Sequence, residues 1–195
     1  MLHRLRGSAQ HAKHFGAVAR ALHAAIPTID DLRVELDERR GTLDISITQD
    51  GASFSSRVIS EGTLTVLALC AIAANPWPSA MVAFEEPENG VHPARLEVIA
   101  LLLVSMARLH GDVPARQVIV TTHSPTFVAA MCARARIAPD LVRLVRCVQN
   151  AGSTALEPFD STGELFEDAE IRAALQPGDC GQLVESMLVR GWLDG

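Results

Sequence analysis

Hydrophobic and polar positions in the first fifty residues alternate first with the period of a helix and then with that of a strand. Apolar residues recur at helical spacing over Gln10–Ala25, which predicts an amphipathic helix. Between residues 32 and 47, two runs alternate apolar and polar positions on either side of the polar sequence Asp37–Gly41. This pattern predicts a β-hairpin with one buried face. Arg39 and Arg40 at its tip could touch a nucleic acid, but a solvated turn explains them more simply.

From residue 60 onward, apolar segments separated by polar corners predict alternating helices and strands. The predicted helices span Glu61–Ala74, Pro93–Leu109 and Pro125–Ala133, and the predicted strands span Met81–Phe84, Gln117–Thr121 and Leu141–Val148. Each strand is a near-continuous apolar run, which is typical of a parallel sheet covered on both faces. We therefore predict an α/β fold with a mostly parallel sheet and flanking helices.

The tail after Gly152 predicts less regular structure. A strand is expected over Thr154–Glu157, followed by an acidic segment that extends to Glu170 and by a last helix around Gln182–Arg190. At 195 residues and 48% hydrophobic residues, the chain is long enough for one compact domain with a core. We divide it into residues 1–58 with the helix and hairpin, residues 59–150 with the α/β elements, and the tail 151–195.

Composition narrows the classes of protein. The net charge of -6 argues against a surface that holds a nucleic acid by charge alone, so a DNA contact would need a local patch or a partner. The longest apolar run, Leu64–Ala74, is too short to span a bilayer, and no signal peptide is apparent, so we expect a cytoplasmic protein without a membrane partner. The four cysteines are widely scattered and predict reduced, mostly buried thiols: Cys70, Cys132, Cys147 and Cys180.

The first corner with candidate chemistry follows the strand Met81–Phe84, where Glu85 and Glu86 are adjacent. Ligands of open parallel sheets bind at the carboxyl ends of the strands, which makes this corner a candidate site. Two adjacent carboxylates repel each other unless a cation sits between them. A divalent metal bound together with a phosphate would satisfy both groups.

Two further corners fall in the same stretch of chain. His123 follows the next strand, and Ser60 and Gly62 stand where an apolar helix begins, a position that favours an anion because of free N–H groups and the helix dipole. Taken alone, Ser60 and His123 could be ordinary caps, and the glutamates could form a solvated turn. All the corners, however, fall at the ends of predicted elements between Ser60 and His123, and this order favours a site.

Together these corners resemble the second half of an ABC-type ATPase head of the RecF and SMC kind, close to the AAA-type ATPases related to the OLD family. Ile59–Thr63 resembles the signature motif, Met81–Glu86 resembles Walker B, Glu88–Pro93 looks like the D-loop, and Val118–His123 looks like the switch-histidine motif. The resemblance covers roughly residues 30–150. It implies the carboxyl-terminal lobe of a P-loop NTPase head, preceded by a helix and a β-hairpin.

The resemblance also implies roles for single residues, with ATP and Mg²⁺ as cofactors. Glu85 would hold Mg²⁺ through water, Glu86 would orient or deprotonate the attacking water, and His123 would contact the γ-phosphate. In this family two heads sandwich the nucleotide, which implies a homodimer. The residues that would face the ATP bound mainly by the other subunit, or line the dimer seam, are Ser60, Glu61, Gly62, Thr63, Asn89 and His92.

Three departures from the family pattern stand out. Glu85 replaces the usual Walker B aspartate, and Glu61 stands where the signature often has glycine. The P-loop pattern G-x-x-x-x-G-K-[ST] does not occur, because the only lysine, Lys13, lacks the surrounding glycines and hydroxyl. We therefore expect an amino-terminal lobe or a partner chain to supply the P-loop, and the isolated chain to be inactive. DNA is a possible partner of the complete assembly.

Two other functions remain open. A metal-dependent hydrolase or nuclease would use five metal ligands, Glu85, Glu86, Glu88, His92 and His123, although their spacing matches no metallohydrolase motif. A non-catalytic dimerisation module would keep the shape of the head and lose its chemistry.

Overall fold

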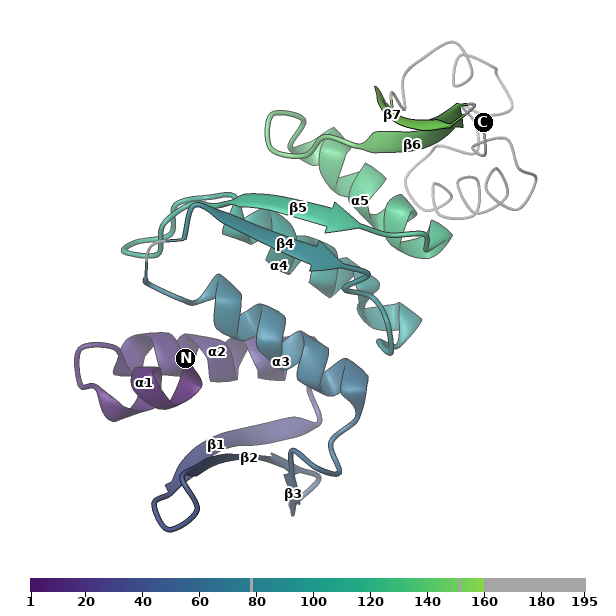
Figure 1. Cartoon of the computed structure of the whole chain (residues 1–195). Helices are drawn as coiled ribbons and strands as arrows, with labels where there is room; N and C mark the ends of the chain where they lie inside the picture. Colours follow the sequence, from purple (N-terminus) through teal and green to yellow (C-terminus); the bar gives the residue numbers. More distant parts are fainter. Residues whose placement is uncertain (78, 151, 160–195) are drawn as a thin grey trace. The chain divides into compact units, whose positions relative to one another are not determined.

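The computed structural model describes residues 1–77, 79–150 and 152–159, which divide into two compact units, Met1–Val120 and the described residues from Thr121 onward (Figure 1). The elements of the first unit are α1 (Leu2–Gly7), α2 (Ala12–Ala25), β1 (Ile29–Asp37), β2 (Thr42–Gln49), β3 (Ala52–Ser55), α3 (Glu61–Ala73), β4 (Met81–Glu85), the 3-10 turn η1 (Pro93–Arg95), α4 (Leu96–Met106) and β5 (Gln117–Thr121). Those that follow are α5 (Pro125–Ile137), β6 (Val145–Asn150) and β7 (Ser153–Pro158).

The predicted hairpin is confirmed as strands β1 and β2, and β3 extends it to a three-stranded antiparallel sheet. Leu32 lies opposite Ile47 in the register, and both are buried. A shift of register between Ile29 and Asp31 lets Ile29 and Leu32 both reach the core although three positions separate them. One face of this sheet therefore closes the core of the first unit, as the alternation predicts.

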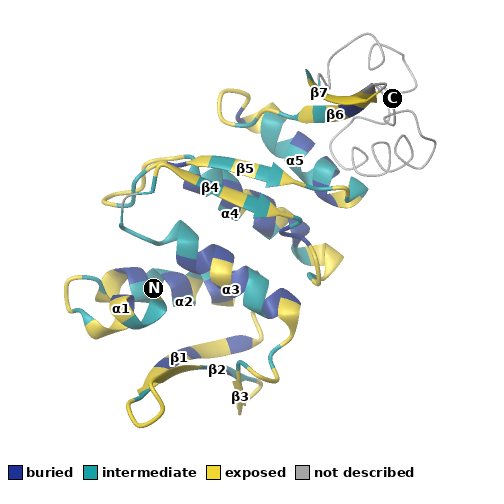
Figure 2. Cartoon of the chain, in the orientation of Figure 1, coloured by how far each residue is buried: buried dark blue, intermediate teal, exposed yellow. Residues whose placement is uncertain are grey.

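The core of the first unit lies among α1, α2, α3 and the buried face of β1 and β2 (Figure 2). Leu5 of α1 and Leu22 of α2 are fully buried in it. Helix α3 is apolar on nearly all sides because it packs against both α2 and α4. Burial raises the pKa of the Cys70 thiol in this helix to about 12, so the thiol stays protonated.

Strands β4 and β5 lie side by side in a two-stranded sheet and run in the same direction (Figure 1). Their apolar residues are only partly covered, and Met81 and Ile119 are 54% and 46% exposed. The expectation that both faces of these strands are buried is therefore wrong for the described part of the chain. Continuous apolar sequence indicates that a strand can be covered, but only the tertiary structure shows which elements cover it.

The prediction of a mostly parallel sheet is also wrong, because the other described strands pair antiparallel. The strand expected at Leu141–Val148 lies further along as β6 and forms a hairpin with β7. Only two residues connect Asn150 to Ser153, and a connection this short cannot cross over to a parallel neighbour. The strand expected at Thr154–Glu157 is confirmed within β7.

Two of the predicted helices have different boundaries in the structure. The helix expected over Pro93–Leu109 is divided into η1 and α4, whereas α5 extends to Ile137, four residues beyond the predicted end. In α5, Phe127 is fully buried, and Ala129 and Cys132 form a buried cluster in the second unit. The acidic segment that extends to Glu170 and the helix around Gln182–Arg190 lie outside the described residues. Within the described ranges, no helix is both long and apolar enough to cross a membrane.

Arg116, at the start of β5, holds the segment that follows α3. Its residue surface is only 3% exposed, burial lowers its pKa, and Nη2 donates hydrogen bonds to the carbonyl oxygens of Asn75 and Trp77. We expect Arg116→Ala to lower the free energy of unfolding by about 2 kcal/mol, since two carbonyl groups lose a charged donor. Chemical denaturation of this variant beside Arg108→Ala, an exposed arginine expected to change stability by less than about 0.5 kcal/mol, checks it.

Candidate functional site

Ser60 begins helix α3 as its N-cap. Its Oγ accepts a hydrogen bond from the backbone N–H of Thr63 at 3.2 Å and donates one to Thr63 Oγ1 at 2.9 Å. Ser60 itself is exposed, whereas Gly62 and Thr63 are buried, and Glu61 in the first turn places a negative charge at the positive end of the helix. The structure thus confirms the capping role, and the hydroxyl lies at the helix end where the sequence predicts an anion site.

Gly62 is in close contact with the loop that follows β4. A Cβ atom at Gly62 would lie 2.0 Å from the carbonyl oxygen of Gly90 and 3.1 Å from Cα of Val91. Gly90 has a φ of +71°, a conformation that glycine adopts without strain. The structure therefore joins the segments that resemble the signature and the D-loop through two glycines, one that permits close packing and one that permits the turn.

Glu86 directly follows β4 in a left-handed backbone conformation, with a φ of 46°. Such a value is uncommon for a residue with a side chain and occurs where the surroundings impose it. Asn89 supplies part of those surroundings, because its backbone N–H donates to Glu86 O at 3.0 Å and its Nδ2 donates to Glu86 Oε2 at 2.5 Å. The two residues are thereby brought together, a contact that the sequence did not predict.

The neighbouring residues of this corner differ in exposure. Glu85, the last residue of β4, is exposed, whereas Glu88 is only 7% exposed. His92 caps η1, with Nδ1 accepting a hydrogen bond from the N–H of Ala94 at 3.2 Å. Its structural role at the start of this turn is thus visible, while a role at a dimer seam stays a prediction.

A cavity of about 330 Å³ opens beside Ser60 and Thr63. Its walls come from the loop before α3, from strands β2 and β3, and from Arg95 of η1. Arg95 is the one basic side chain among these lining residues, and sequence reasoning missed it. Arg95 follows His92 by three positions, but nothing in the sequence predicts that it lies beside Ser60, thirty-five positions earlier.

His123 lies in the second unit, in the turn between β5 and α5. The side chain is exposed, and the turn is ordered by Ser124, whose N–H donates to Thr122 Oγ1 at 3.0 Å. Ser124 Oγ in turn accepts from the N–H of Phe127 at 3.3 Å and caps α5. The cap of α5 is therefore Ser124 and not His123.

The described residues contain no group of three or more histidine, cysteine, aspartate or glutamate side chains placed to hold a metal ion. The alternative of a metal-dependent hydrolase needs such a group from Glu85, Glu86, Glu88, His92 and His123. Nothing in the part of the chain that the structure describes favours it.

The chain is similar to known proteins over most of this region. A family model described as "AAA domain, putative AbiEii toxin, Type IV TA system" matches residues 6–129, which is more than half of the chain. No curated protein matches it.

Three solved structures of SMC ATPase heads are similar in fold. One comes from work on ATP-driven dimerisation and DNA-stimulated activation of SMC ATPases, with 17% identity, a TM-score of 0.55, and coverage of 76% of this chain and 86% of that one. A second is the Pyrococcus furiosus SMC head with an extended coiled coil bound to the C-terminal domain of ScpA, with 16% identity, a TM-score of 0.55, and coverage of 77% and 36%. The third is an SMC head bound to the winged-helix domain of ScpA, with 16% identity, a TM-score of 0.52, and coverage of 82% and 48%. At these identities the likeness shows a shared fold, and the chain spans less than half the length of the last two structures.

Proposed function

The chain belongs to this AAA-domain family, and on that premise we propose that it supplies one part of a composite site that binds and hydrolyses ATP. The fold shared with SMC heads supports an ATPase-type function. The part supplied here carries the segments that resemble the signature, Walker B, D-loop and switch histidine. A P-loop, which the 195 residues do not contain, comes from another lobe or chain.

The observation that carries the proposal is the contact between Gly62 and Gly90. It ties the helix start at Ser60 to the loop in which Asn89 holds Glu86. A site that hydrolyses a nucleotide must fix a phosphate-binding group and a base relative to each other, because misplacement of about 1 Å can cost a hundredfold in rate. Two glycines in contact provide such a fixed spacing between the two motifs.

Within this site Glu86 acts on the attacking water. Its carboxylate accepts a hydrogen bond from Asn89 Nδ2, which orients the group that would accept a proton from the attacking water. Glu85, exposed at the end of β4, offers a carboxylate oxygen, the kind of ligand that Mg²⁺ prefers. When bound, Mg²⁺ would neutralise charge on the phosphates. For His123, which lies in the second unit, the resemblance implies a contact to the γ-phosphate.

The cavity beside Ser60 receives the phosphate end of an ATP held mainly by the P-loop of a second subunit. Ser60 offers a hydroxyl, α3 offers the positive end of its dipole, and Arg95 offers a guanidinium. Because the two parts of the site come from different subunits, two such heads pair around the nucleotide. ATP-driven dimerisation and DNA-stimulated activation are named for the similar SMC ATPases, and we extend both to the complete assembly of this chain.

Steady-state measurement of phosphate release tests this function. The chain alone with Mg-ATP is expected to show no turnover above buffer, and addition of a P-loop-bearing lobe, encoded beside it or fused to it, is expected to restore turnover. Strong hydrolysis by the pure chain alone would contradict the composite site. Turnover by the mixture that does not require Mg²⁺ would contradict the proposed chemistry.

A further inference from the structure

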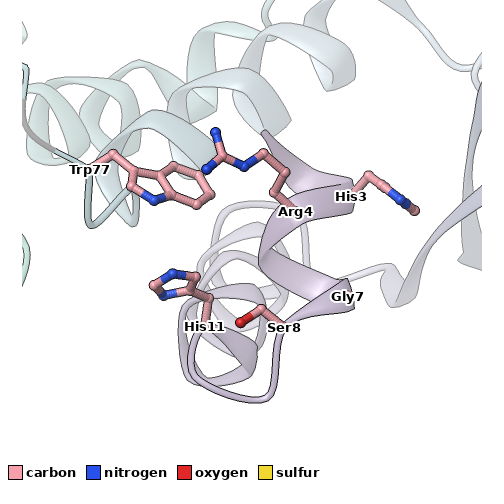
Figure 3. Close-up of a pocket in the computed structure, with 6 residues that line it drawn as sticks. All are labelled: His3, Arg4, Gly7, Ser8, His11 and Trp77. Atoms are coloured by element: carbon pink, nitrogen blue, oxygen red, sulfur yellow. The ribbon is translucent and has the colours of Figure 1, made fainter.

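A second cavity in the first unit lies away from the candidate ATP site and shares no lining residue with it. Its volume is about 380 Å³, and it is bounded by α1, by the turn between α1 and α2, and by the segment that follows α3. Figure 3 shows its lining residues, His3, Arg4, Gly7, Ser8, His11 and Trp77. This volume falls in the range of pockets that hold small ligands and exceeds what a single inorganic ion needs.

The ionisable side chains that line the cavity are all basic. Its lining includes one arginine, two histidines and a serine, but no carboxylate. The segment that forms most of it is also basic, because the first acidic residue of the chain is Asp30, whereas Arg4, Arg6, Lys13 and Arg20 precede it. In a chain of net charge -6 this is a local reversal of sign, and it favours an anionic ligand.

Trp77 contacts Arg4 and His11, two of the side chains that can donate a hydrogen bond to a ligand in the cavity. The guanidinium carbon of Arg4 lies 4.4 Å from the centre of the indole ring, a cation–π contact, and the His11 ring meets the indole at 5.3 Å with an interplanar angle of 75°. A guanidinium has five N–H donors in a planar fork, which can bind two phosphate oxygens. In Figure 3, Arg4 and His11 lie next to Trp77, the Ser8 hydroxyl points toward His11, and His3 points away from all three.

The position of Trp77 is itself fixed by backbone hydrogen bonds and by packing against the core. Its backbone N–H donates to Asn75 Oδ1 at 3.0 Å, its carbonyl accepts from the buried Arg116, and its side chain packs against the core. Asp112, which is not among the lining residues, is engaged by Lys13 at 2.9 Å and by the buried His14 at 3.2 Å. The hydrogen bond from Lys13 is the main reason that the pKa of Asp112 is lowered, so this carboxylate remains charged and paired outside the cavity.

We propose that this cavity binds the phosphate ester of a nucleotide, with Arg4 and His11 on the phosphate, Ser8 as a further donor, and the sugar or base in the remaining space. The shared chemistry is a phosphate joined to an organic group, because one-sided positive charge selects the phosphate and the volume accommodates more than phosphate alone. Such a group belongs either to a free mononucleotide or to a strand of nucleic acid. The proposal stands independently of the ATPase function.

Fluorescence of Trp77 in the full-length chain measures this binding directly. The chain has two tryptophans, so Trp192→Phe leaves Trp77 as the only reporter. The probes are uridine 5′-monophosphate, which lacks the β- and γ-phosphates of ATP, uridine, and six-nucleotide oligothymidylate with and without a 5′-phosphate. Saturable change of emission is expected with the monophosphate and not with uridine. Tighter binding of the oligonucleotide than of the monophosphate identifies a strand as the source, and equal binding of the two identifies a free nucleotide.

Variants distinguish binding in this cavity from general electrostatic attraction to the basic segment. Arg4→Gln is expected to weaken binding about tenfold or more, because a charge-assisted pair of hydrogen bonds is lost. His11→Gln, a second lining variant, is expected to weaken it as well. Arg20→Gln removes the same charge from the same basic segment outside the cavity and is expected to change affinity less than about twofold.

Three results would overturn the proposal: uridine binding as tightly as its monophosphate, equal loss of affinity in the Arg4 and Arg20 variants, or no saturable change with any probe. Circular dichroism and thermal unfolding of each variant show whether it is folded before its affinity is compared. Because Arg4 is an exposed residue, we expect Arg4→Gln to fold.

Discussion

Glu86→Gln should lower steady-state ATP turnover by the complete assembly by about a hundredfold or more, since general-base assistance is worth about 10²–10⁴ in rate. The amide keeps the shape of the side chain and can still accept the hydrogen bond from Asn89, but it cannot take a proton from water. Mg-ATP affinity is expected to change far less than turnover. Phosphate release and nucleotide binding, measured on the same reconstituted sample, separate the two effects.

Glu97→Gln is the matched control, because it makes the same chemical change at an exposed glutamate in the first turn of α4. Its turnover should stay within about twofold of the unmodified assembly. If Glu86→Gln retained more than a third of the original turnover, Glu86 would not be the base. In that case the non-catalytic dimerisation module would become the better explanation of the conserved shape of the head.

Gly62→Ala should destabilise the chain by about 3 kcal/mol, at the upper end of the usual cost of overpacking. The new Cβ atom would lie 2.0 Å from the carbonyl oxygen of Gly90, and backbone cannot move aside as a flexible side chain can. Each kcal/mol lowers the unfolding temperature of a domain of this size by about 2–4 °C. Thermal unfolding followed by circular dichroism should therefore show a clear decrease.

Gly16→Ala provides the comparison within the same unit. A Cβ atom at Gly16, inside α2, would meet only the end of the flexible Arg20 side chain at 3.2 Å. Alanine is favoured over glycine in a helix by about 1 kcal/mol, so this variant should be as stable as the original or more stable. Equal unfolding temperatures for the Gly62 and Gly16 variants would show that the first turn of α3 and the loop that contains Gly90 are not tightly packed against each other.

The same contact links stability to activity. If Gly62→Ala folds after moving the loop that contains Gly90, Asn89 moves with it, and its hydrogen bond to Glu86 should be lost or lengthened. Assembled turnover would then decrease even at a temperature where the variant remains folded. In that case Gly62 would influence Glu86 through the loop that contains Gly90 and Asn89.

Sequence patterns predicted the elements whose causes are local. The helix at α2, the hairpin of β1 and β2, and the starts of α3 and α5 follow from local sequence patterns, and the structure confirms them. The candidate corners were also found by sequence, because each is a short motif at the end of an element. The family match confirms that these corners were read in the right class of protein.

What the sequence determined by itself was therefore the class of fold, the local elements and the identity of the chemical groups. The tertiary structure decided which of these groups lie together, because such contacts join residues far apart in the chain. Gly62 contacts Gly90, and Arg95 lines the cavity beside Ser60. The exposure of Met81 and Ile119 likewise depended on which elements are present to cover them. The Trp77 cavity followed the same rule, since α1 and the end of α3 meet only when the core between them is packed.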